Sequence, residues 1–203
     1  GLIDSLPETN SIRLEGAGKA REAGLARFRQ WNVAGPVIGV SPGAAYGGAK
    51  RWLPERFAEA AASLAQSRNG SVAVFGAPAE ADLCERVAEM ARRRSARVVN
   101  LGGATDLSEF IDLAAACDLF LTNDSGAMHI AAALGVPTVA IFGATDPAAT
   151  GPVGPSVRVV REPVECAPCL LRECPIDHRC MVRLTAARVV EEALGLLEPA
   201  RSC

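Results

Sequence analysis

With 203 residues, 49% hydrophobic content and a formal net charge of −2 at pH 7, the chain can bury a full core without disulfides. Its balanced charge disfavours a nucleic-acid partner, because no basic block is large enough to cover a face. No apolar run approaches the roughly 20 residues that a membrane-spanning helix needs, which excludes such a helix.

The first 35 residues precede a regular alternation of strands and helices. The sequence starts at Gly1 and its first methionine is Met90, so we expect the natural start to lie upstream. A helical pattern runs from about residue 15 to 31 and ends at Gly35-Pro36. We interpret residues 1–35 as a remnant of an upstream domain with a linker helix.

From residue 36 onward, short Val/Ile/Leu-rich strands alternate with helical patterns. Six apolar strands separated by helices predict a parallel sheet that is covered on both faces. The fold class is therefore α/β, a Rossmann-like domain over residues 36–203 with a cysteine-rich loop at 166–180. Strands are predicted at 37–41, 71–76, 97–102, 118–123, 137–143 and 156–160, and helices at 54–67, 80–94, 107–117, 125–135 and 185–197.

Two loops that follow strands carry residues suited to an anionic ligand. In "SPGAAYGGAKRW" (41–52), small residues allow backbone N–H groups to approach a ligand, and Lys50 can reach an anion as a mobile charge. The same loop is equally consistent with a flexible connection. In "FGAPAE" (75–80), Glu80 either stabilises the start of the next helix or accepts hydrogen bonds from ribose hydroxyls.

A third loop, "TNDSGAMHIAAALG" (122–135), places polar residues at the start of a helix. Asp124 or Ser125 can cap that helix, which leaves N–H groups of Ser125 and Gly126 at its positive end. His129 follows Ser125 by one turn, so the two side chains are expected on the same side. These residues favour a phosphate site over the alternative of a plain cap and a half-buried histidine.

Three segments together resemble the C-terminal half of family 9 glycosyltransferases. They are "NDSGAMHIAAALGVPTVAIFG", "SPGAAYGGAKRW" and "CAPCLLRECPIDHRCM", and the resemblance runs from about residue 37 to 197. The family contains the ADP-heptose:lipopolysaccharide heptosyltransferases, and the cysteine-rich segment is most similar to type II members. The resemblance implies a GT-B fold, with the nucleotide-sugar on the C-terminal domain represented here.

The resemblance also implies a role for each candidate residue. Lys50 and His129 would stabilise the leaving group, and Asp124 would bind the heptose or order the turn. The donor-binding set is Lys50, Glu80, Asp124, Ser125, Gly126 and His129. The resemblance implies an inverting transfer without a cofactor, and the absence of an Asp-x-Asp pair from the chain fits chemistry that needs no metal.

By the same resemblance, the general base would be an aspartate on a missing N-terminal domain. We therefore expect this chain alone to bind ADP-heptose without turnover. The acceptor would be a lipid-anchored lipopolysaccharide core, and the protein would be cytoplasmic, with peripheral contact at the inner membrane. The helix at 185–197 is expected to cross back to the missing half. The sequence does not identify the acceptor or the nucleobase of the donor.

Rival functions are a non-catalytic nucleotide-binding module, another GT-B enzyme such as a sugar-nucleotide epimerase, and a zinc or redox protein. The last depends on the four cysteines of the loop, whose role the sequence leaves open. Reduced thiols packing an irregular loop, a zinc site that could include His178, and disulfides are the alternatives. The four are Cys166, Cys169, Cys174 and Cys180.

Overall fold

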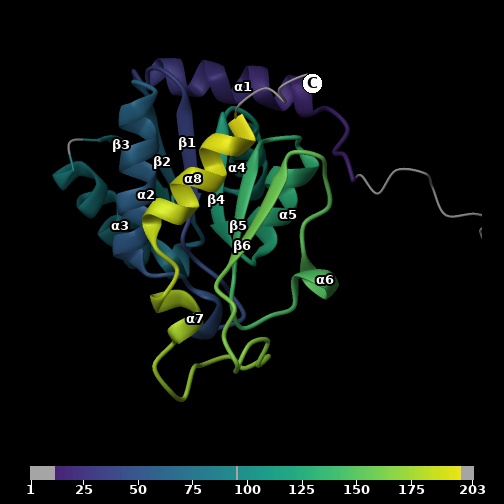
Figure 1. Cartoon of the computed structure of the whole chain (residues 1–203). Helices are drawn as coiled ribbons and strands as arrows, with labels where there is room; N and C mark the ends of the chain where they lie inside the picture. Colours follow the sequence, from purple (N-terminus) through teal and green to yellow (C-terminus); the bar gives the residue numbers. More distant parts are fainter. Residues whose placement is uncertain (1–11, 95, 198–203) are drawn as a thin grey trace, which may run out of the picture.

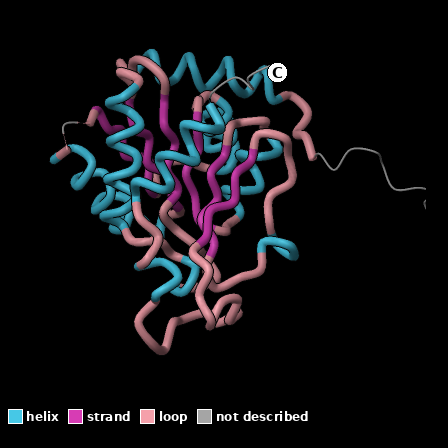
Figure 2. Tube along the Cα trace, viewed as in Figure 1, coloured by secondary structure: helices cyan, strands magenta, loops and turns pink. Residues whose placement is uncertain are grey.

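Six parallel strands form a single sheet, with the order β3-β2-β1-β4-β5-β6 (Figures 1 and 2). The computed structural model describes residues 12–94 and 96–197. The sheet confirms the predicted α/β class, and every strand boundary lies within one residue of its predicted place. The strands are β1 (Val37–Ser41), β2 (Ser71–Gly76), β3 (Arg97–Gly102), β4 (Leu119–Asn123), β5 (Thr138–Phe142) and β6 (Val157–Arg161).

Helices follow the strands and cover both faces of the sheet. Alternate residues of one strand point to opposite faces, so Leu119 and Leu121 join one core cluster while Phe120 joins another. The first cluster lies under α2 (Pro54–Ser67), α3 (Ala81–Arg93) and α8 (Ala186–Leu197). The second lies under α1 (Ala17–Gln30), α4 (Leu107–Ala115) and α5 (Gly126–Ala133).

Gly39 allows the central strands to pack on the second cluster. A Cβ at this position of β1 would lie 2.5 Å from the Phe120 ring and 2.9 Å from Cys117 Sγ. The space over β1 is therefore filled by a ring from the neighbouring strand β4. This close contact fixes how the two halves of the sheet meet.

The first described helix, α1, packs along α4. Phe28 is buried in the second core cluster, and Arg21 donates a hydrogen bond to the Ala115 carbonyl (3.0 Å). Residues 12–30 are therefore attached to this domain. That residues 1–35 derive from an upstream domain stays a prediction, and residues 1–11 lie outside the described part of the chain.

The last helix, α8, does not follow the expectation from the sequence. It packs beside α2 and over β5 and β6, and Val189 and Ala193 are fully buried in the first core cluster (Figure 1). Its apolar face covers the end of the sheet that α2 and α3 leave open. The prediction that this helix crosses back to a missing half is therefore wrong.

Four short helices were not predicted from the sequence. They are too short for helical periodicity to be visible. Each lies in the connection that follows a strand: η1 after β1, η2 after β2, α6 after β5 and α7 after β6. α6 and α7 lie at the same end of the molecule in Figure 1. The four are η1 (Gly48–Lys50), η2 (Pro78–Glu80), α6 (Pro147–Thr150) and α7 (Arg179–Val182).

None of the helices described in residues 12–94 and 96–197 combines the length and the apolar character needed to cross a bilayer.

Candidate functional site

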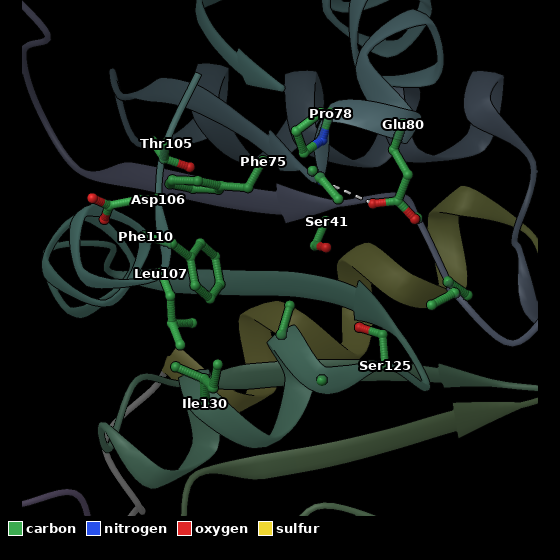
Figure 3. A pocket seen from close by; sticks show the side chains of 17 residues that line it. Ser41, Phe75, Pro78, Glu80, Thr105, Asp106, Leu107, Phe110, Ser125 and Ile130 are labelled. Atoms are coloured by element: carbon green, nitrogen blue, oxygen red, sulfur yellow. Dashed lines mark hydrogen bonds between the residues drawn. The ribbon is translucent and has the colours of Figure 1, made fainter. Parts of the chain in front are cut away.

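A pocket opens at the carboxyl ends of β1, β2 and β4, and Figure 3 shows its side chains. Ligands of open parallel sheets bind at this edge, next to the point where the strand order reverses. Here that point lies between β1 and β4. The labelled lining residues are Ser41, Phe75, Pro78, Glu80, Thr105, Asp106, Leu107, Phe110, Ser125 and Ile130.

One end of the pocket is apolar. Phe110 meets Phe75 edge to face, with ring centroids 5.4 Å apart, and Leu107 and Ile130 lie nearby (Figure 3). Leu107 has 64% of its surface exposed although it is a large apolar residue at a helix start. An aromatic wall beside exposed aliphatic groups suits a flat heterocycle, which would cover this apolar surface.

The other end holds the start of α5. Ser125 is the N-cap residue, but its side chain makes no capping hydrogen bond and its Oγ lies 3.2 Å from Thr122 Oγ1. Gly126 is exposed, and a Cβ added to it would meet nothing within 4 Å. The positive end of α5 therefore faces open space, which is the arrangement that binds phosphate groups.

Glu80 lies across the pocket from Ser125, away from the apolar end (Figure 3), and Gly43 leaves room for it. A Cβ at position 43 would be only 2.0 Å from Glu80 Oε1. Glu80 Oε2 accepts a hydrogen bond from the Ala77 N–H (3.1 Å), and its other oxygen is 3.9 Å from the Arg51 guanidinium. The contact to Ala77 fits the helix-start alternative, while the position in the pocket leaves the carboxylate available to a sugar hydroxyl.

Lys50 and Asp124 form an ion pair beside the pocket, outside its lining. Lys50 Nζ lies 2.7 Å from Asp124 Oδ2, and the two side chains are 12% and 5% exposed. Asp124 also accepts hydrogen bonds from Thr145 (2.6 Å) and Thr150 (3.3 Å). The carboxylate is therefore not the helix cap. It holds the lysine ammonium next to the start of α5.

His129 is exposed on α5 and does not line the pocket. Of the six candidate residues, the structure brings three to the pocket: Glu80, Ser125 and Gly126. Lys50 and Asp124 lie beside it as a pair. Ser125 and His129 were expected on the same side of α5, but Ser125 lines the pocket and His129 does not. A phosphate-binding role for His129 stays a prediction.

Several site residues were missed from the sequence. Thr145, in the loop after β5, and Thr150, at the end of α6, bind Asp124 from more than 20 positions away, and no local pattern marks them. Arg51 follows Lys50 directly, and nothing in the sequence distinguishes it from an exposed arginine. Its guanidinium donates to the Ala44 carbonyl (3.2 Å), and its buried Nε has no hydrogen-bond partner in the described part of the chain. The sequence predicts Phe110 only as part of a helix.

The four cysteines of the loop are free thiols. Burial, and then the neighbouring Cys166, Cys169 and Cys174, raises the pKa of Cys180. Across residues 12–94 and 96–197, no three His, Cys, Asp or Glu side chains are arranged to hold a metal ion. Cys180 is buried and the other three are half-buried, and the role of the four stays open among the alternatives given above.

Comparisons with known proteins give one consistent family. The family model for glycosyltransferase family 9 (heptosyltransferase) matches residues 7–179. Lipooligosaccharide heptosyltransferase 2 of Campylobacter jejuni is 38% identical over 80% of this chain and 51% of its own length. Lipopolysaccharide heptosyltransferase 2 of Escherichia coli K12 is 35% identical over 80% of this chain and 47% of its own length.

A solved structure agrees with these matches. The E. coli ADP-heptose LPS heptosyltransferase II superposes with a TM-score of 0.74 at 31% identity, over 95% of this chain and 55% of that one. The α/β fold described above is therefore the fold of part of that enzyme. The chain spans about half the length of the curated relatives it matches.

Proposed function

The chain belongs to glycosyltransferase family 9, the heptosyltransferase family, and we propose that it is the donor-binding half of such an enzyme. The whole protein would transfer heptose from ADP-heptose to a core oligosaccharide acceptor in lipopolysaccharide inner-core synthesis. The observation that carries this proposal is the pocket, which has an apolar aromatic end and, at its other end, a carboxylate opposite an uncapped helix N-terminus.

Each part of the pocket suits one part of ADP. The wall of Phe75 and Phe110 fits the flat adenine ring. Glu80 is available to accept hydrogen bonds from the ribose, and the start of α5 at Ser125 and Gly126 would receive the diphosphate. Lys50 keeps two further N–H donors after its bond to Asp124, so it can also approach the anion.

The proposed reaction is an inverting displacement at the anomeric carbon of heptose. The acceptor oxygen forms a bond to that carbon as the bond to the diphosphate oxygen of ADP breaks. Negative charge then grows on the departing diphosphate, and Lys50, the N–H groups of α5 and His129 would stabilise it. Asp124 would hold Lys50 and accept a hydrogen bond from a heptose hydroxyl, because a carboxylate is a poor direct neighbour for phosphate.

We assign the general base and the acceptor site to a domain outside this chain. The chain alone is then expected to bind donor without turning it over. The acceptor would be anchored in the cytoplasmic face of the inner membrane, so we propose a cytoplasmic protein with peripheral membrane contact. Such contact would leave the donor pocket open to dissolved nucleotide-sugar.

Calorimetric titration of this chain with ADP, ADP-heptose, UDP and UDP-N-acetylglucosamine tests the proposal. We expect ADP and ADP-heptose to bind and the uridine nucleotides not to bind. Lys50→Ala and His129→Ala should each weaken ADP binding by more than about 1 kcal/mol, the net contribution of an ordinary hydrogen bond. Preference for uridine nucleotides would overturn the heptosyltransferase proposal.

Two alternatives give different results in the same titration. A non-catalytic nucleotide-binding module would bind ADP and ADP-heptose equally, because it makes no contact with the sugar. A sugar-nucleotide epimerase would need further carboxylates at the sugar end. In the described lining that end contains Glu80 but neither Asp124 nor another acidic group near Ser125, and Asp106 lies at the apolar end.

A further inference from the structure

The cysteine-rich segment (166–180) lies directly against the glycine-rich loop (41–52). The Ala49 N–H donates to the Arg172 carbonyl (2.9 Å), and the Gly48 N–H donates to Glu173 Oε1 (2.9 Å). His178 Nε2 lies 3.1 Å from the Ala49 carbonyl and must donate to it, since a carbonyl only accepts. Tyr46 Oη also donates a hydrogen bond to the Leu170 carbonyl (3.0 Å). Each of these four hydrogen bonds joins residues more than 120 positions apart in the sequence.

Glycines make this contact possible. A Cβ on Gly47 would lie 2.3 Å from the Arg172 carbonyl oxygen, and a Cβ on Gly48 would lie 2.4 Å from Glu173 Oε2. Gly47 also has a φ of +156°, which side chains rarely adopt. The glycines therefore serve the close approach of the cysteine-rich segment, in addition to any approach of a ligand.

The contacts converge on Lys50. The single turn η1 ends at this residue and is too short to hold itself in place. Two cations lie against the Tyr46 ring, with Lys50 Nζ 4.8 Å and the Arg172 guanidinium 5.2 Å from its centroid. The segment also reaches the loop after β5, where the Leu170 N–H donates to the Ala144 carbonyl (2.8 Å).

Ala144 precedes Thr145, which donates to Asp124. The cysteine-rich segment therefore braces both partners of the ion pair, Lys50 through η1 and Asp124 through the loop after β5. We infer that this segment positions the anion-binding lysine of the donor site, and that Glu173 is a positioning residue for the donor diphosphate. The inference rests on the proposed function.

The direction in which Glu173→Ala changes ADP affinity distinguishes positioning of η1 from a simple effect of charge. Glu173→Ala removes a negative charge near the proposed diphosphate site, which by charge alone should tighten ADP binding. If the carboxylate positions η1, the same change releases the Gly48 N–H and weakens ADP binding. Glu173→Gln keeps an acceptor oxygen and loses the charge, so it should restore binding.

The experiment measures ADP and adenosine affinities of this chain by calorimetry. We expect Glu173→Ala to weaken ADP about tenfold, the loss of roughly one charge-assisted hydrogen bond, and to leave adenosine unchanged. Glu173→Gln should lie within about twofold of the unmodified chain, a change too small to match one lost hydrogen bond. Glu165→Ala is the matched control, because Glu165 is exposed beside the same segment and pairs with Arg179, and its carboxylate makes no hydrogen bond to the glycine-rich loop in the described part of the chain.

Three results would overturn the inference while leaving the proposed function intact. They are unchanged or tighter ADP binding by Glu173→Ala, an equal loss of adenosine, and an equal loss in Glu165→Ala. If the unmodified chain binds neither ADP nor adenosine, the proposed function fails and this inference fails with it. Urea unfolding of each variant shows whether a loss of ADP affinity comes from misfolding. If Glu173→Ala does not fold, the ADP affinity of Glu173→Gln decides whether the acceptor oxygen at position 173 is sufficient for binding.

Discussion

Replacing Gly126 by alanine separates the stability of the empty domain from its affinity for ligand. Gly126 is the first residue of α5, it is exposed, and an added Cβ would meet nothing within 4 Å. Alanine in a helix without strain stabilises the folded chain by about 0.4–1 kcal/mol. The same methyl group would occupy the space in which a diphosphate approaches the start of α5. The loss of about one hydrogen bond to a charged group, roughly 1.5–3 kcal/mol, predicts a tenfold to hundredfold weaker affinity for ADP.

Gly195 supplies the matched control. It lies exposed in α8, and a Cβ there also meets nothing within 4 Å. Urea unfolding should give both variants a similar gain in stability, and calorimetry should show weaker ADP binding for Gly126→Ala alone. Normal ADP affinity in Gly126→Ala would refute the placement of the diphosphate at α5. Destabilisation would refute the view that the space in front of Gly126 is open.

Three further predictions concern other parts of the molecule. Glu80→Gln should weaken ADP about tenfold but leave 2′,3′-dideoxy-ADP unchanged, as measured by calorimetry; an equal loss for both would remove the ribose role. Trp52→Phe should lower the free energy of unfolding by about 1–3 kcal/mol, because the buried Leu184 carbonyl loses the indole N–H that donates to it (3.1 Å); urea unfolding tests this. Burial raises the pKa of Cys84 from 9.0 to about 12 and also raises that of Cys117, so the unfolded chain loses these protons first as pH rises. The free energy of unfolding should then fall above pH 9, by about 1.4 kcal/mol per pH unit for each thiol, and less steeply in a Cys84→Ala/Cys117→Ala variant; an identical slope in both proteins would contradict this cause.

The sheet could be predicted closely because its signal is local. Runs such as "VIGVS" and "SVAVFG" are buried along their length, and a buried parallel strand needs apolar residues at almost every position. The two faces of the sheet need helices, and amphipathic patterns of 8 to 14 residues are long enough to be recognised. The loop patterns, and then the family resemblance, pointed to Glu80, Ser125 and Gly126, which the structure gathers at one pocket.

The remaining features depend on contacts between distant residues. Lys50 and Asp124 are 74 positions apart, and their pairing requires the β1–β4 register, in which Ser41 lies beside Thr122. The cysteine-rich segment has no periodic pattern, so its contacts with Gly48 and Ala49 left no local signal. The apolar face of α8 could be recognised in the sequence, but the sequence did not show that this face packs on β5 and β6.

The strand order has a consequence for how the pocket comes into being. β1, β2 and β3 pair with their neighbours in sequence, as do β4, β5 and β6, and only the β1–β4 pairing joins the two groups. That junction must close a loop of about 80 residues, which makes it the slow, non-local step of folding. Ser41 and Glu80 belong to one group, while Ser125 and Ile130 belong to the other. A nucleotide in the pocket would therefore bind only chains in which the junction has formed, so its presence should slow the opening of the β1–β4 seam more than the fraying of either edge strand.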